Sequence, residues 1–189
     1  MKTLFEFYED NYLKDTPVVE EGNTEKKLSY TMLDLTGELE KKILDYGSYI
    51  SDSDLYDGGV GSSFGREDDS HITLLYGIHS DSSDGVKEIL EGASPFIITL
   101  GDISYFESDD YDVMKIDVTS DELMELNEKM QTIDHDSTYP EYKPHVTIAY
   151  VNKDFNKEPY DASAFNGIEY MVDSVVFINH SGDREVVWL

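Results

Sequence analysis

One short pattern occurs twice in this chain, and each copy follows a similar strand and helix. His-Ile-Thr at 71–73 opens the run HITLLYG, and His-Val-Thr at 145–147 opens the run HVTIAY. Upstream, LDLT at 33–36 matches IDVT at 116–119. Each copy therefore reads as strand, helix, loop and strand, and a further strand follows it. This duplication predicts two similar lobes that pair about a pseudo-twofold axis and bring the two histidine strands together.

The pattern of apolar and turn-forming residues completes the outline. Strands are predicted at 28–36, 71–78, 95–106, 111–118, 145–151, 170–179 and 184–189, and helices at 37–50, 84–91 and 119–133. The stretch 51–70 is rich in Ser, Asp and Gly and is predicted to be a long loop. We expect an acidic N-terminal arm over 1–26 and one bilobal domain over 27–189. Its lobes are built around 28–106 and 111–189.

Each copy of the pattern places a histidine and a threonine on one face of a strand. Residues i and i+2 of a strand point the same way, so His71 lies beside Thr73, and His145 beside Thr147. On neighbouring strands, two imidazoles can divide general base and general acid work, each typically contributing about 10²–10⁴-fold. The threonine hydroxyls can donate hydrogen bonds to oxygens on which charge builds up. One copy alone is more often an ordinary strand histidine, but two copies in matching contexts favour a shared catalytic site for proton transfer around a phosphate.

The repeat also assigns faces to the strands that precede the two helices. Aligning Asp34 with Asp117 groups one almost wholly apolar set, which we assign to the core: Thr31, Leu33, Leu35, Met114, Ile116 and Val118. The opposite faces, which include Tyr30 and Lys115, then line the space between the lobes. We predict that Lys115 contacts a phosphate and that Tyr30 is a surface on which a base stacks, although each also fits an ordinary strand position.

The charge balance limits the partners that the chain can have. It carries 41 acidic against 14 basic residues, a net charge of −27, and should repel duplex DNA and long RNA. A mimic of nucleic acid is an alternative interpretation of the same acidity. Local cations would decide whether a small anion binds, and the candidates are Lys115, Lys143, Lys153 and Arg66. Lys143 is predicted to contact the substrate, because Pro144 favours an extended chain that gives it the face of His145.

Several classes of protein are disfavoured by what the sequence lacks. It has no cysteine, which excludes disulfides and thiolate metal sites. Acidic residues follow Met1 and Lys2 closely, and no apolar run approaches the ~20 residues of a membrane span. We therefore expect a soluble cytoplasmic protein without a membrane partner. The run 51–59 resembles a calcium loop but lacks ligands in register, so we predict an ordinary loop there. For the chain as a whole we predict neither a metal ion nor another cofactor.

The pair His71-Ile72-Thr73 and His145-Val146-Thr147 resembles the signature of the two-histidine (2H) phosphoesterase superfamily, which includes 2′-5′ RNA ligase-like proteins and cyclic phosphodiesterases. The resemblance covers 28–189. It implies an α+β, bilobal, pseudo-twofold fold in which antiparallel sheets line a central cleft and helices lie outside. It further implies that all four motif residues line the cleft, that the two histidines are acid and base in an order left open, and that no metal is required.

Within that superfamily, the runs YKPHVTIAY and HITLLYG and the acidic composition are most similar to the phage anti-CBASS phosphodiesterases. Enzymes of that family degrade the cyclic di- and trinucleotides that bacteria use as antiviral signals. The resemblance implies a hydrolase for 3′-5′ bonds of cyclic oligonucleotides, working in the cytoplasm of an infected bacterium. The alternatives are a 2′,3′-cyclic phosphodiesterase for RNA ends or small nucleotides, and a non-catalytic acidic binder. The oligomeric state and the preferred bases stay open.

Overall fold

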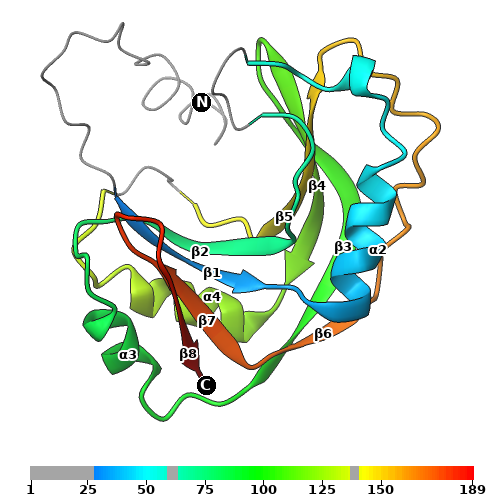
Figure 1. The fold of residues 1–189 in the computed structure, drawn as a ribbon. Coiled ribbons are helices and arrows are strands. Elements are labelled where there is room, and N and C mark those ends of the chain that lie inside the picture. Colours follow the sequence, from blue (N-terminus) through cyan, green and yellow to red (C-terminus); the bar gives the residue numbers. More distant parts are fainter. Residues whose placement is uncertain (1–27, 59–63, 137–140) are drawn as a thin grey trace, which may run out of the picture.

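The computed structural model describes residues 28–58, 64–136 and 141–189; the predicted arm at 1–26 lies outside them. Two four-stranded antiparallel sheets curl toward each other, with helices on their outer sides (Figure 1). Sheet A has the order β2-β1-β7-β8, namely His71–Ile78, Ser29–Asp34, Ser174–Ile178 and Arg184–Trp188. Sheet B has the order β5-β4-β3-β6, namely His145–Asn152, Tyr111–Thr119, Phe96–Glu107 and Glu169–Val172. The predicted bilobal α+β fold is confirmed.

The three predicted helices are present, and two of them pack against the sheet to which their flanking strands do not belong. They are α2 (Gly37–Gly47), α3 (Asp84–Leu90) and α4 (Asp121–Met130). The N-cap of α4 is Ser120, whose Oγ accepts a hydrogen bond from the Leu123 N–H at 3.3 Å. Helix α2 follows β1 of sheet A but packs on β5 of sheet B, whereas α4 follows β4 of sheet B and packs on β2 of sheet A. Across the described residues, the structure contains no helix with the length and apolar surface that a membrane crossing demands.

The two halves of the sequence do not form separate sheets. Strand β3 belongs to the first half but lies in sheet B, and β7 and β8 of the second half complete sheet A. The single strand predicted at 170–179 is two strands, β6 and β7, interrupted at Asp173 where the chain passes from one sheet to the other. The short turn after Glu107 explains the exchange, because it pairs β3 with β4 as an antiparallel hairpin and so keeps β3 in sheet B.

The core follows the faces that the repeat predicts. The main core includes the apolar residues assigned inward from both copies: Leu33, Leu35, Met114, Ile116 and Val118. Two smaller clusters occupy the opposite faces, one around Met32 on sheet A and one around Tyr111 on sheet B. A slip of one residue would move each buried set to the other face, so this burial fixes the register of β1 and β4 and with it the partners of the histidine strands.

The described parts of the predicted loop 51–70 cover the free edge of β5. The Tyr56 N–H donates to the Tyr150 carbonyl at 2.9 Å, and the Tyr150 N–H donates to the Gly65 carbonyl at 2.7 Å. The backbone groups of an edge strand need partners, and these bonds supply them. The end of the same loop delivers Asp69 to the position just before β2.

Candidate active site

The two histidine strands lie side by side where the sheets meet. His71 is the first residue of β2 and His145 the first of β5, and these two strands are in contact. A hydrogen bond ties them locally: the hydroxyl of Tyr142, just before β5, donates to the Thr73 carbonyl of β2 at 3.0 Å. The two rings are close enough for the charge of His71 to contribute to the lowered pKa of His145. The structure thus brings the two motif copies into one region.

Each histidine stands opposite an aspartate on the neighbouring strand. His71 of β2 pairs with Asp34 of β1, and His145 of β5 pairs with Asp117 of β4. These are the two aspartates that the internal repeat aligns. The two copies therefore share not only a motif but also the register in which the motif is held.

The predicted threonines follow the histidines on the same strand faces. Thr73 and Thr147 are half-buried, whereas Ile72 and Val146, which precede them, are fully buried in the main core. This alternation leaves the histidine and threonine of each strand on the face turned away from the core. The four predicted catalytic side chains, His71, Thr73, His145 and Thr147, thus all lie on strand faces directed away from the main core.

Both imidazoles are held through Nδ1 by the residue two positions earlier. His71 Nδ1 lies 2.7 Å from Asp69 Oδ1, and His145 Nδ1 lies 2.7 Å from the carbonyl oxygen of Lys143. A carboxylate and a carbonyl accept hydrogen bonds but cannot donate them, so Nδ1 carries the proton in both rings. The nitrogen available for proton transfer is therefore Nε2 in both.

The surroundings of His145 hold its ring neutral at pH 7. The ring packs edge-on against Phe106, with centroids 4.9 Å apart, and the Lys115 ammonium lies 4.3 Å from the Phe106 centroid. Burial, helped by the charges of Lys115 and His71, lowers the pKa of His145 from 6.5 to about 4. At neutral pH this ring has a free lone pair on Nε2, which is the state a general base needs.

The two lysines predicted to contact substrate lie at different depths. Lys115 is buried, and its Nζ donates to Ser104 Oγ at 2.6 Å and pairs with Asp117. Lys143 is exposed and lies 3.6 Å from Glu141. The charge of Lys115 is thus already balanced by Asp117, and Lys143 lies at the exposed edge of the site. Their contacts with a phosphate stay predictions.

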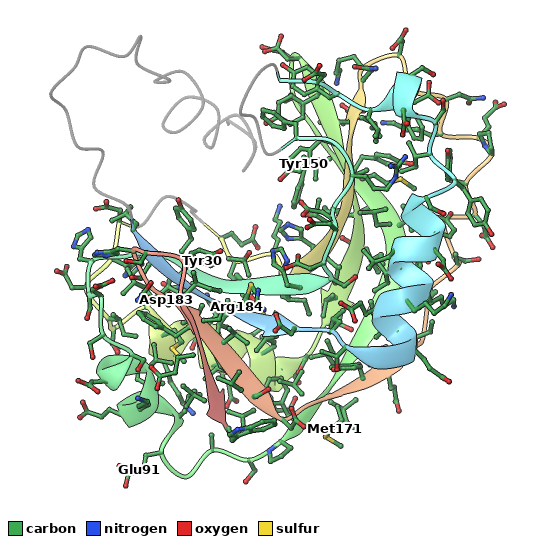
Figure 2. The ribbon with its side chains drawn as sticks, in the orientation of Figure 1. Tyr30, Glu91, Tyr150, Met171, Asp183 and Arg184 are labelled. Atoms are coloured by element: carbon green, nitrogen blue, oxygen red, sulfur yellow. The ribbon has the colours of Figure 1, made fainter. Side chains whose placement is uncertain are left out.

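Sequence reasoning missed a cation on sheet A, Arg184. Its Nη2 donates to Asp34 Oδ2 at 2.6 Å, and its Nη1 lies 3.8 Å from Asp69 Oδ2. Figure 2 shows it near Tyr30 on this sheet, and its charge opposes the effect of burial, which raises the pKa of Tyr30. Tyr30 also lies beside Tyr76, with ring centroids 5.9 Å apart. Nothing in the local sequence marks Arg184, because only the return of β8 to sheet A brings it to this position.

Two other candidate cations, Arg66 and Lys153, make contacts within the fold. Arg66 donates from Nε to the Gly47 carbonyl at 2.9 Å and from Nη2 to the Ile50 carbonyl at 2.6 Å, so it caps the end of α2. Lys153 pairs at 2.6 Å with Asp112, a carboxylate that is almost fully buried. Arg66 therefore satisfies backbone carbonyls, and Lys153 balances the charge of a buried carboxylate.

Acidic side chains next to the site form one cluster with metal-like spacing among the described residues: Glu67, Asp68 and Asp69. Asp69 is already engaged by His71 and Arg184. Burial raises the pKa of Glu67; the charge of His71 opposes this effect, and Asp69 and Asp68 add to it. Asp69 is thus the member of this cluster that supports His71.

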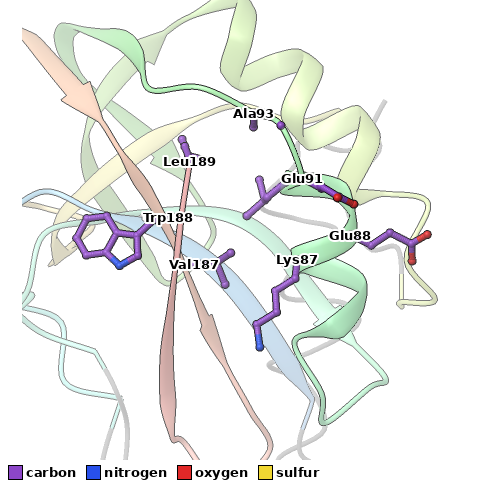
Figure 3. Close-up of a pocket in the computed structure, with 9 residues that line it drawn as sticks. Lys87, Glu88, Glu91, Ala93, Val187, Trp188 and Leu189 are labelled. Atoms are coloured by element: carbon purple, nitrogen blue, oxygen red, sulfur yellow. The ribbon is translucent and has the colours of Figure 1, made fainter.

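A separate pocket of about 430 Å³ lies between α3 and the end of β8 (Figure 3). Its walls include Leu90 and Trp188, and none of the predicted site residues lines it. Trp188 therefore belongs to a different part of the surface from the paired histidines.

Two strands that each begin with His-x-Thr, side by side where two curled antiparallel sheets meet, define the class of two-histidine phosphoesterases. The sequence profile of the 2′-5′ RNA ligase superfamily matches residues 62–184, and the chain belongs to that superfamily, whose members are phosphoesterases.

Solved structures with this fold include Escherichia coli LigT complexed with phosphate. It has a TM-score of 0.57 and 16% sequence identity, covering 88% of this chain and 96% of LigT. Another is Kluyveromyces marxianus Usb1 with uridine monophosphate, with a TM-score of 0.55 and 10% identity, covering 87% of this chain and 99% of Usb1. At such identities the likeness concerns the fold. The chain has no match among curated proteins.

Proposed function

We propose that this chain is a phosphodiesterase that hydrolyses 3′-5′ bonds of cyclic di- and trinucleotides without a metal ion. The observation that carries the proposal is the pair of histidines on neighbouring strands, each held through Nδ1 and each with Nε2 left for proton transfer. Membership of a phosphoesterase superfamily supports the reaction class. The substrate is inferred from charge and from the motif resemblance.

In the proposed reaction His145 is the general base and His71 the general acid. The neutral His145 takes the proton of a ribose 2′-hydroxyl through Nε2 while that oxygen bonds to phosphorus. The bond from phosphorus to the 5′-oxygen breaks, and His71 gives that oxygen its Nε2 proton. Water then opens the 2′,3′-cyclic phosphate with the two roles reversed.

Thr73 and Thr147 are proposed to bind the nonbridging oxygens of the reacting phosphate. Their hydroxyls lie on the histidine faces of β2 and β5 and can each donate one hydrogen bond. Negative charge grows on these oxygens as the nucleophile attacks, so donors fixed in advance favour the transition state. Tyr30 would stack on a base, Lys115 would supply positive potential, and Lys143 would meet substrate at the rim.

The net charge of −27 supports a small substrate. Repulsion between exposed charges is screened beyond about 8–10 Å in physiological salt, so two or three phosphates in one site meet mainly local groups. A long polyanion would experience much more of the acidic surface. Two described cations beside the site, Lys115 and Arg184, are already paired with carboxylates. We therefore propose no duplex nucleic acid as partner.

The biological setting follows from the substrate. Cyclic oligonucleotides act as antiviral signals in bacteria, and the motif resemblance to phage anti-CBASS phosphodiesterases supports this use. We propose that the protein destroys such signals in the cytoplasm of an infected bacterium and thereby counters CBASS defence.

A 2′,3′-cyclic phosphate on an RNA end or small nucleotide is the second candidate substrate. It is favoured by the mononucleotides in the similar structures: Usb1 was solved with uridine monophosphate and LigT with 3′-AMP. A non-catalytic acidic binder fits less well, because neither a nucleotide sponge nor a nucleic-acid mimic needs a pair of proton-transfer groups.

One incubation separates these candidates. The protein is mixed with cyclic dinucleotides, cyclic trinucleotides and nucleoside 2′,3′-cyclic phosphates in EDTA, and products are identified by mass spectrometry after denaturation. Linear products from the cyclic oligonucleotides support the proposal. Turnover confined to the nucleoside cyclic phosphates supports the second candidate, and ligand that is bound but recovered intact indicates a sponge. Activity that disappears in EDTA contradicts a metal-independent mechanism.

A further inference from the structure

The two histidines differ in the atom that holds Nδ1. For His71 the acceptor is the side-chain carboxylate of Asp69, and for His145 it is the main-chain carbonyl of Lys143, both at 2.7 Å. The positions correspond in the two copies of the repeat, since each lies two residues before its histidine. One copy has an acidic residue there and the other a basic one. An otherwise symmetric site is therefore asymmetric in charge.

Asp69 is itself held in place from another strand. Its second oxygen, Oδ2, lies 3.8 Å from Arg184 Nη1, while Arg184 Nη2 donates to Asp34 Oδ2 at 2.6 Å. A chain of charged groups thus runs from Asp34 on β1 through Arg184 on β8 to Asp69 and His71. It provides a second contact for a carboxylate that lies at the end of a loop and has 43% of its side chain exposed.

We propose that Asp69 is a positioning residue that prepares His71 to act as the general acid, and that Arg184 holds Asp69 in the orientation this requires. The inference rests on the proposed function. A carboxylate on Nδ1 fixes the tautomer of the ring and stabilises the positive charge of the doubly protonated form. That form carries the Nε2 proton that the leaving oxygen needs. When the proton has been transferred, the neutral ring keeps its Nδ1–H bond to Asp69.

The same comparison explains why His145 takes the opposite role. Its acceptor is a neutral carbonyl, its ring packs on Phe106, and Lys115 lies nearby. These surroundings disfavour a second proton on the ring. The base and the acid are thus distinguished by the residues around them, although the two motifs are alike.

The experiment combines a spectroscopic readout with kinetics. Imidazole ¹⁵N chemical shifts of the substrate-free protein report which nitrogen of His71 carries the proton when the ring is neutral. In the unaltered chain we expect the proton on Nδ1. In Asp69→Ala we expect a mixture in which Nε2–H is substantial, and a roughly 10–100-fold lower kcat with little change in KM. Arg184→Gln should shift both readouts the same way, by less. Asp68→Ala removes the exposed neighbouring carboxylate and should change neither.

Each outcome decides the proposal. A His71 tautomer that is unchanged in Asp69→Ala overturns it, and so does a changed tautomer with an unchanged kcat. Equal losses in Asp69→Ala and Asp68→Ala would show a general effect of charge and would also overturn it. The tautomer is read without substrate, so a chain that hydrolyses no cyclic oligonucleotide refutes the proposed function while the spectra still test the contact between Asp69 and His71.

Discussion

His71 and His145 show how the same residue acquires different chemistry from its neighbours. Each occupies the first position of a strand and faces an aspartate across the sheet. His71 meets a carboxylate that an arginine holds, whereas His145 meets a carbonyl and an aromatic ring. In the proposed reaction this difference determines the direction of proton transfer.

Removal of either imidazole should abolish turnover and leave binding largely intact. We expect His71→Ala and His145→Ala each to reduce kcat by about 10²–10⁴-fold, the usual contribution of a general acid or base. His180→Ala is the matched control, because His180 follows β7, outside both motifs, and faces Asp81. Single-turnover assays give the rate of the chemical step, and calorimetry with a nonhydrolysable analogue gives affinity. Full activity in either motif variant would refute the assigned roles.

The lowered pKa of His145 predicts the acid side of the pH profile. Burial lowers this pKa from 6.5 to about 4, so the folded protein keeps a neutral base until the pH falls to about 4. We therefore expect kcat/KM to lose the contribution of the base with a midpoint near 4. A midpoint near 6.5 on this limb would show that the ring is not held neutral by its surroundings.

The same shift predicts how stability depends on pH. The unfolded chain takes up the proton of His145 near pH 6.5, and the folded chain only near pH 4. Stability from this group is thus fully present above pH 6.5 and is lost as the pH falls toward 4. Urea unfolding of the unaltered chain and of His145→Gln across this range measures the difference, which should shrink on acidification. A difference that grows as the pH falls would contradict the assignment.

At the scale of elements, β2 makes a close backbone contact with the segment after α4. Gly77 has φ +87°, and a Cβ there would lie 2.9 Å from the Asp136 carbonyl oxygen. We expect Gly77→Ala to lower the free energy of unfolding by about 2–4 kcal/mol, from backbone strain and the clash together. Gly92→Ala, with φ +77° and no atom within 4 Å of its Cβ, should cost only about 1–2 kcal/mol. Urea denaturation compares the two, and equal losses would contradict the clash.

The elements were largely predictable because their signals are local. Alternating apolar residues marked β1, β2, β4 and β5, and helical spacing marked α2 and α4. The break at Asp173 was not predictable, because the run on either side is continuously strand-like and the change of sheet depends on packing elsewhere. For the same reason strand alternation assigned Lys115 a face but could not reveal its pairing with Asp117 and Ser104.

At the scale of the whole molecule, the histidine and threonine positions were predictable from the duplication, but their supports were not. Asp69 could have been noticed from the contrast between Asp69-Ser70-His71 and Lys143-Pro144-His145. Arg184 carried no such signal, because its approach to Asp34 depends on how β8 returns to sheet A. The repeat thus predicts the His-x-Thr positions that the two copies share, whereas contacts between distant segments determine how the surroundings of the two histidines differ.

The net charge of −27 predicts an unusual dependence on salt. Repulsion of an anionic substrate by the protein as a whole should weaken as salt is added, so kcat/KM for a cyclic dinucleotide should rise between about 20 and 200 mM salt. Long single-stranded RNA should fail to compete at low salt. Steady-state kinetics test this, and a steep fall of kcat/KM with salt would instead show that a basic surface guides the substrate.

The proposed reaction requires both imidazoles to serve one phosphodiester, and a crystal structure with a nonhydrolysable phosphorothioate cyclic dinucleotide would reveal whether they do. We predict one phosphate between β2 and β5, with Nε2 of His71 and Nε2 of His145 each within about 3.2 Å of its oxygens. A phosphate that contacts only one of the two rings, or one seated in the pocket beside α3, would contradict a shared site.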